Sequence, residues 1–213
     1  MRILLTSITL LVALILSTPA FSQSEKEIKK DIKKKALKDA RKEAKRLKKD
    51  GFKVAPGQLP MDKQIEQVWI KRYETDNEGN KMWFITDARA VGESHSAAKM
   101  QANEVAKIAI ANQIGAEVAG LIETNIANSQ LNAEDAASIT ETVATFKSIV
   151  GSKLGRINTL FDASKTIDKN TEVFITLGYS YASAVEMSKK ILREQLKEKA
   201  NLQSDQLNQL LDF

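Results

Sequence analysis

The sequence predicts an α+β protein: an antiparallel sheet of two hairpins packed against a long central helix and further helices, preceded by a basic helical arm. Three observations predict this fold. A helical pattern without proline runs from His95 to Gln130. Aromatic and β-branched runs form a pair on each side of it, each pair joined by an Asp/Asn-containing turn. Further amphipathic patterns follow, and hairpins separated by helices favour helices on one face of an antiparallel sheet.

The first 22 residues have the organisation of a secretory signal peptide. Arg2 precedes an apolar run from Ile3 to Leu16, and small residues at Ala20 and Ser22 fit a signal-peptidase site. The run is shorter than the ~20 residues that span a bilayer, which favours cleavage after Ser22 over an uncleaved anchor. By its sequence pattern, no later segment approaches a membrane span. We therefore expect an exported protein, periplasmic or associated with the outer membrane.

The charge of the chain is unevenly distributed. Its net charge is +5, but Ser24 to Lys53 carries 14 Lys or Arg against 6 Asp or Glu, which leaves Val54 to Phe213 mildly acidic. The sequence has no cysteine, which excludes disulfides, thiol catalysis and an N-terminal cysteine lipid. These features indicate a basic arm joined to an acidic body.

The arm, Ser24 to Asp50, reads as a helix with Ser24 and Glu27 as a capping box and Gly51 as a left-handed C-terminal residue. Its apolar seam is thin, so we expect the helix to lie on the body or project from it, and a chain starting near Val54 to keep a cooperative melt. The seam consists of Ile28, Ile32, Ala36, Ala40, Ala44 and Leu47. The expected organisation is signal peptide 1–22, arm 23–51, linker 52–66, α+β domain 67–199 and tail 200–213.

The first hairpin is predicted from two strands, Gln67 to Glu74 and Met82 to Val91, around a turn at Asp76 to Asn80. Met61 to Glu66 is expected to form a helical turn before it. The aromatic residues Trp69, Tyr73, Trp83 and Phe84 gather on this hairpin. Packing within the fold is the favoured interpretation, and an exposed patch that binds a glycan or a partner is the alternative.

The central helix, which Ser94 can cap, has a predicted buried stripe that includes Gly115, where a close crossing with another element is expected. The whole stripe is Met100, Ile108, Ala111, Ile114, Gly115, Val118, Leu121, Ile122 and Ile126. A second face of small residues in its first half would let another backbone approach closely. That face carries Ala98, Ala102, Val105, Ala106 and Ala109.

The second half of the chain alternates between helices and strands. Asn132 is predicted to cap a helix that runs to about Val150. Strands at Arg156 to Lys165 and Glu172 to Ser180 form the second hairpin, and a last amphipathic helix spans Ala182 to Lys199. The tail, residues 200–213, is either a short docking helix or frayed.

Part of this order resembles a known family. A strand ends near Ala88-Arg89-Ala90, an Ala-rich helix follows, and after a second helix a paired strand runs from Val173 to Tyr179. The pattern over about Gln67 to Lys199 resembles the twenty-kilodalton bacterial outer-membrane lipoprotein family and the related N-terminal domain of a flagellar outer-ring protein. Segments at 48–64 and 132–142 also resemble uncharacterised exported proteins of Gram-negative bacteria. The resemblance implies an envelope or secreted protein with no catalytic residues to transfer. The lipidation cysteine of that family is missing here.

The sequence offers little catalytic chemistry. His95 is the single histidine, and its place in the first turn of a helix favours a surface or capping role. The carboxylates are scattered, Asp76 to Asn80 lacks the spacing of a calcium loop, and no phosphate-binding glycine motif occurs. We expect no enzyme activity, no cofactor and no metal. The leading hypothesis is a non-enzymatic structural or interaction protein of the bacterial envelope, and a hydrolase is the least favoured alternative.

A surface-binding module is the second hypothesis. In it the basic arm docks on anionic envelope lipid or polymer, while export disfavours nucleic acid as a partner. A solvated helix that binds nothing is the competing interpretation. The residues assigned to anionic-surface binding are Lys33, Lys34, Lys35, Arg41, Lys42, Lys45 and Arg46. The partner protein or polymer is left open.

Overall fold

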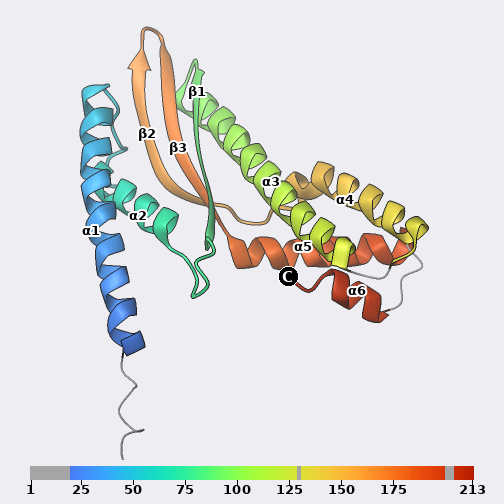
Figure 1. Ribbon diagram of the computed structural model, residues 1–213. Coiled ribbons are helices and arrows are strands. Elements are labelled where there is room, and N and C mark those ends of the chain that lie inside the picture. Colours follow the sequence, from blue (N-terminus) through green and yellow to red (C-terminus); the bar gives the residue numbers. More distant parts are fainter. Residues whose placement is uncertain (1–19, 129–130, 200–203) are drawn as a thin grey trace, which may run out of the picture.

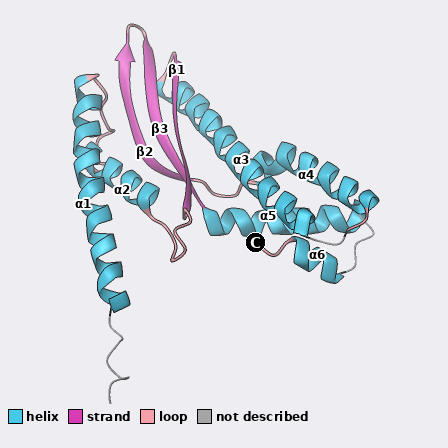
Figure 2. Ribbon diagram, viewed as in Figure 1, coloured by secondary structure: helices cyan, strands magenta, loops and turns pink. Residues whose placement is uncertain are grey.

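The computed structural model describes residues 20–128, 131–199 and 204–213. Within them it has helices packed around one three-stranded antiparallel sheet, which confirms the predicted α+β class (Figures 1 and 2). The strands are β1 (Trp83–Gly92), β2 (Asn158–Ile167) and β3 (Asn170–Ser180). The helices are α1 (Ala20–Lys49), α2 (Met61–Tyr73), α3 (His95–Asn128), α4 (Ala133–Lys153), α5 (Tyr181–Lys199) and α6 (Ser204–Leu210).

The sheet contains one hairpin, not the two predicted. β2 and β3 form the expected hairpin, and Asp168 in its turn has a positive φ of 53°. β1 pairs directly with β3, so the strand order is β1-β3-β2. The predicted partner of β1, Gln67 to Glu74, is not a strand.

That segment belongs to α2, which begins six residues earlier than the predicted strand. Met61, Ile65 and Val68 are buried and recur at the steps of four and three residues that a helix requires. The β-branched and aromatic residues Val68, Trp69 and Ile70 led to the wrong assignment, because tertiary packing overrides weak local propensity. The turn at Asp76 is confirmed. Its carboxylate accepts hydrogen bonds from the Asn80 and Glu78 backbone N–H groups, and the Asn80 bond is the main cause that lowers its pKa.

One face of the sheet is covered by α3, which packs against β1 and β3 (Figure 1). On β3 the residues at every second position, Val173 to Tyr179, lie in this core, as expected of an alternating strand. On α3 the predicted stripe is buried at Ala111, Ile114, Gly115, Val118 and Ile122 and partly buried at Leu121, but it is wrong in the first half. Met100 and Ile108 are 67% and 57% exposed. The small face at Ala98, Ala102 and Ala106 is buried instead, because it lets α3 lie close against the sheet.

The helices after α3 complete this first core. Asn132 caps α4 as predicted, since its side chain accepts from the Asp135 N–H at 2.8 Å. Ser94 likewise caps α3 through the Ala97 N–H. The tail forms a docking helix, α6, whose Leu207 and Leu210 are buried. The Asn125 side chain donates to the Leu210 carbonyl oxygen at 2.9 Å and fastens α6 to α3.

The opposite face of the sheet carries a second core, so helices cover both faces rather than the single face predicted. α1 and α2 pack against Phe161, Ala163 and Phe174 there. The α1 seam at Ala40, Ala44 and Leu47 is 0–3% exposed, which corrects the expectation that it is too poor to join a core. The boundary between linker and domain at residues 66 and 67 falls inside α2.

The two ends of α1 were predicted with different success. Gly51 has φ +90° and follows the helix as expected, with the Phe52 N–H donating to the Leu47 carbonyl oxygen. Ser24 does not cap the helix, because α1 already begins at Ala20. Most of the predicted signal peptide, residues 1–19, lies outside the described residues.

Among the described residues, one helix is long and apolar enough to cross a membrane by length and composition. It is α3, over His95–Ala127, which corrects the expectation that no segment after the leader approaches a span. Its buried alanines lie against the sheet, and a core helix passes the same test.

Candidate anionic-surface site

All seven predicted anion-binding residues lie on α1 and are exposed. They are not equivalent, however. On a helical wheel with Lys33 at 0°, the residues of the buried seam lie near 340°. Four of the cations lie at roughly 80–180° and therefore point away from the seam: Lys34, Arg41, Lys42 and Lys45. Arg46 lies beside Glu43 at 3.5 Å, and the Lys35 ammonium lies 4.5 Å from the centre of the Tyr73 ring. These two residues therefore border the contact with α2.

α2 binds the acidic residues of α1. The Tyr73 hydroxyl donates to Asp39 at 2.8 Å, and the Trp69 indole N–H donates to Glu43 at 2.9 Å. Each pair is spaced by four residues on its own helix, so two antiparallel helices can make both bonds at once. Partial burial and the hydrogen bond to Asp39 raise the pKa of Tyr73 to about 12. Both acidic groups are thereby turned toward α2.

This arrangement leaves a basic outer face on α1. Between Lys33 and Lys49 the sequence has ten Lys or Arg, and its acidic residues there are the same Asp39 and Glu43. Lys38 and Lys49 are also exposed on the outer side and were missed by the sequence analysis. Their spacing from Lys34, Arg41, Lys42 and Lys45 in steps of three, four, seven or eight residues could have identified them. We call these six residues the basic face: Lys34, Lys38, Arg41, Lys42, Lys45 and Lys49.

The aromatic residues near this site pack within the fold, as the favoured interpretation predicted, but they come from α2 and β1 rather than from a hairpin. Trp69 stacks on Tyr73 with ring centres 5.4 Å apart, and Phe84 stacks on Tyr181. The Trp83 indole N–H donates to Glu74, and the Lys71 ammonium lies 3.3 Å from the centre of the Trp83 ring. None of these five aromatic side chains is more than partly exposed.

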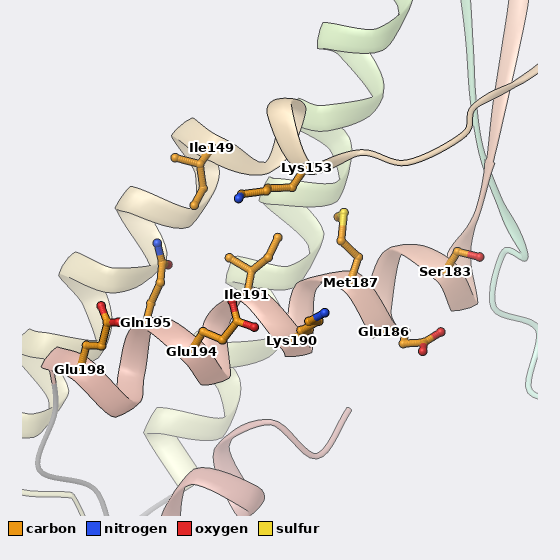
Figure 3. A pocket seen from close by; sticks show the side chains of 10 residues that line it. All are labelled: Ile149, Lys153, Ser183, Glu186, Met187, Lys190, Ile191, Glu194, Gln195 and Glu198. Carbon is orange, nitrogen blue, oxygen red and sulfur yellow. The ribbon is translucent and has the colours of Figure 1, made fainter.

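A groove of about 590 Å³ lies between α4 and α5 (Figure 3). Met187, Ile191 and Gln195 point from α5 toward α4, and Ile149 and Lys153 extend from α4. The buried Gln195 Oε1 has no hydrogen-bond partner among the described residues. The charged residues on its rim, including Lys153, Lys190 and Glu194, have mixed signs, so the groove selects no class of ligand by charge.

His95 is exposed as the first residue of α3 and does not line the groove between α4 and α5. The buried carboxylate of Asp162 pairs with Lys99 at 2.5 Å and its backbone N–H donates to Gln64, so these groups satisfy one another. No cluster of three His, Cys, Asp or Glu residues that could hold a metal ion occurs in residues 20–128, 131–199 and 204–213.

No family model matches the chain, and no curated protein or solved structure is significantly similar to it. The resemblance to the outer-membrane lipoprotein family therefore stays a prediction.

Proposed function

We propose that this protein is a non-enzymatic, exported interaction protein of the cell envelope that docks through the basic face of α1 on an anionic lipid surface. One observation carries the proposal. The acidic residues of α1 between Lys33 and Lys49 are bound to Tyr73 and Trp69, so the outer side of this segment presents cations alone.

The physical argument is electrostatic. Each Lys or Arg near an anionic membrane contributes about 1 kcal/mol, and this attraction falls off within a Debye length of about 8 Å at physiological salt. Six cations on one rigid helix face can approach a flat surface together. The apolar seam of α1 faces the second core, which leaves little apolar surface for insertion. Binding should therefore be peripheral and sensitive to salt.

Vesicle co-sedimentation tests the proposal. We expect the chain to sediment with vesicles of phosphatidylglycerol and phosphatidylcholine at low salt and to be released from them at high salt. It should not sediment with vesicles of pure phosphatidylcholine. Replacing the six residues of the basic face by glutamine should abolish binding without lowering the melting temperature, because none of these side chains is buried.

A matched control removes six exposed cations elsewhere: Lys147, Lys153, Arg156, Lys169, Lys190 and Lys197. This variant has the same change in net charge but keeps the basic face, so it should bind anionic vesicles nearly as well as the wild type. Equal loss in both variants would show that net charge alone drives the association. Binding to neutral vesicles, or no binding at low salt, would contradict the proposal.

A further inference from the structure

The two edges of the sheet differ in their backbone hydrogen bonds to the rest of the chain. At the β2 edge, Lys53 and Ser164 exchange two backbone hydrogen bonds of 2.8 and 2.9 Å, and Gln64 accepts from the Asp162 N–H. β1 forms the other edge, and from Trp83 to Gly92 its outer side makes no backbone pairing with any described residue. An open edge of this length is a template for another strand.

The hydrogen-bonding pattern of β1 shows which of its residues direct their backbone groups away from β3. The Met82 carbonyl oxygen accepts from the Tyr181 N–H, and the register from Trp83 to Gly92 against β3 has no interruption. Backbone groups alternate sides along a strand. The even-numbered residues therefore bond to β3, and Ile85, Asp87, Arg89 and Val91 direct their N–H and C=O groups outward.

We propose that two copies of this chain join their sheets through β1, antiparallel, about a twofold axis at Ala88. In this register Asp87 of one copy lies opposite Arg89 of the other, twice. Sliding the pair so that the axis falls on Asp87 places two aspartates opposite each other, and moving it to Arg89 places two arginines opposite each other. Like charges across a strand pair destabilise it and opposite charges stabilise it, so charge selects the Ala88 register.

Three further features of the described residues fit this pairing. Arg72 and Thr176 hold the Asp87 carboxylate at 2.6 and 2.7 Å, which fixes its position at the edge. Val91, 48% exposed, comes to lie opposite the partly buried Ile85 of the second copy. A twofold axis beside β1 also places the α3 helices of both copies on the same face of the joined sheet, since α3 packs against β1 and β3.

The pairing has a consequence for the proposed membrane contact. A twofold axis perpendicular to the sheet keeps the faces of both copies on the same side. Both α1 helices then lie on one face of a six-stranded sheet, where two basic faces raise the effective concentration of binding groups at a surface. The pairing itself stands without this contact, since it rests on β1 alone.

The oligomeric state of the full chain tests the proposal first. Light scattering after size exclusion should give twice the 23.6 kDa of one chain. Val91→Pro removes an outward N–H that the pairing between copies uses, so this variant should be a monomer. Its fold should persist, because an edge strand tolerates proline where no intrachain bond is lost. Val91→Thr, which keeps that N–H, should stay dimeric. Should the proline variant fail to fold by circular dichroism, Arg89→Glu replaces it and should raise the dimer Kd on the order of tenfold.

A disulfide cross-link then tests the register of the two β1 strands. The chain has no cysteine of its own, so an introduced cysteine is its single thiol. Ala88→Cys places the two thiols opposite each other at the axis, within bonding range, and should oxidise to a covalent dimer. Val91→Cys places its two thiols six residues apart along the strands and should stay unlinked. A monomer at all concentrations, or cross-linking of Val91→Cys in place of Ala88→Cys, would overturn the proposal. Neither outcome bears on the salt-dependent vesicle binding of a single chain.

Discussion

At the scale of single residues, Gly115 fixes how closely α3 and α4 approach. A Cβ there would already be in van der Waals contact with Lys147, 3.4 Å from its Cγ and 3.5 Å from its Cα, so the further atoms of a larger side chain would have to displace α4. Gly115→Leu should therefore destabilise the protein by about 1–3 kcal/mol through overpacking. Chemical denaturation with circular dichroism measures this change.

Gly120 is the matched control on the same helix. It is exposed and a Cβ there would meet nothing within 4 Å, so Gly120→Ala should raise the free energy of unfolding by up to about 1 kcal/mol through helix propensity. If Gly115→Leu were as stable as the wild type, the crossing of α3 and α4 at this point would be wrongly placed.

Tyr73 should give stability a dependence on alkaline pH. Its pKa in the folded protein is raised from 10.0 to about 12 by partial burial and by its bond to Asp39. Folding therefore favours the neutral phenol. This stabilisation is complete below about pH 10 and is lost as the pH rises toward 12. Urea unfolding of the wild type and of Tyr73→Phe should show the difference between them shrinking over that interval. A difference that is independent of pH would mean that neither burial nor the bond to Asp39 raises the pKa of Tyr73 in solution.

At the scale of elements, the contact of α1 with the body is a core contact. Leu47 is fully buried in the second core, whereas Leu59 in the loop after α1 is 53% exposed. Leu47→Ala should cost about 2–5 kcal/mol through lost burial and a cavity, and Leu59→Ala less than about 0.5 kcal/mol. Thermal melts of the two variants compare them directly.

Truncation tests the same contact more severely. A chain that begins at Val54 lacks the apolar cover that α1 provides for Phe161 and Phe174, so it should lose stability or aggregate. The thin apolar seam of this segment predicts the opposite outcome. Wild-type stability of the truncated chain would show that α1 is a separable arm after all.

The prediction that α1 is a separable arm was wrong because residues 67–74 were assigned as a strand. With residues 67–74 assigned as a strand, α1 had no helix to pack on, and its alanines looked too small for a core. Small residues are what two closely packed helices need, and Ala36, Ala40 and Ala44 are buried for that reason. The caps at Ser94, Asn132 and Gly51 were predictable, because capping is governed largely by neighbouring residues, whereas the cap at Ser24 was wrong because the helix extends past it to Ala20.

The candidate site was predictable in part for a similar reason. Composition identified the basic helix, and all seven named cations are exposed. Which cations form its outer face depends on α2, because Tyr73 and Trp69 bind Asp39 and Glu43 and turn them inward. The edge position of β1 was hidden as well, since the predicted hairpin paired that strand with residues that form a helix.

At the scale of the whole molecule, β3 belongs to both cores. Phe174 contacts the α1 and α2 side, and its neighbours Val173 and Ile175 contact the α3 side. Neither core can be lost without disturbing the strand that supports the other. We therefore predict a single cooperative unfolding transition for the described body, despite its two separate apolar clusters.

Two spectroscopic probes can test this prediction, because they report on different regions. Trp69 and Trp83 lie on α2 and at the start of β1, so tryptophan fluorescence reports the side near α1. Far-ultraviolet circular dichroism is dominated by the helices, of which α3, α4 and α5 contribute to the other core. The two unfolding curves should coincide. Phe146→Ala, in α4 and fully buried, should shift both midpoints by the same amount although neither tryptophan belongs to the core that contains Phe146. A fluorescence transition that precedes the dichroism transition, or that stays in place in the Phe146 variant, would show that the α1 and α2 layer unfolds as a unit of its own.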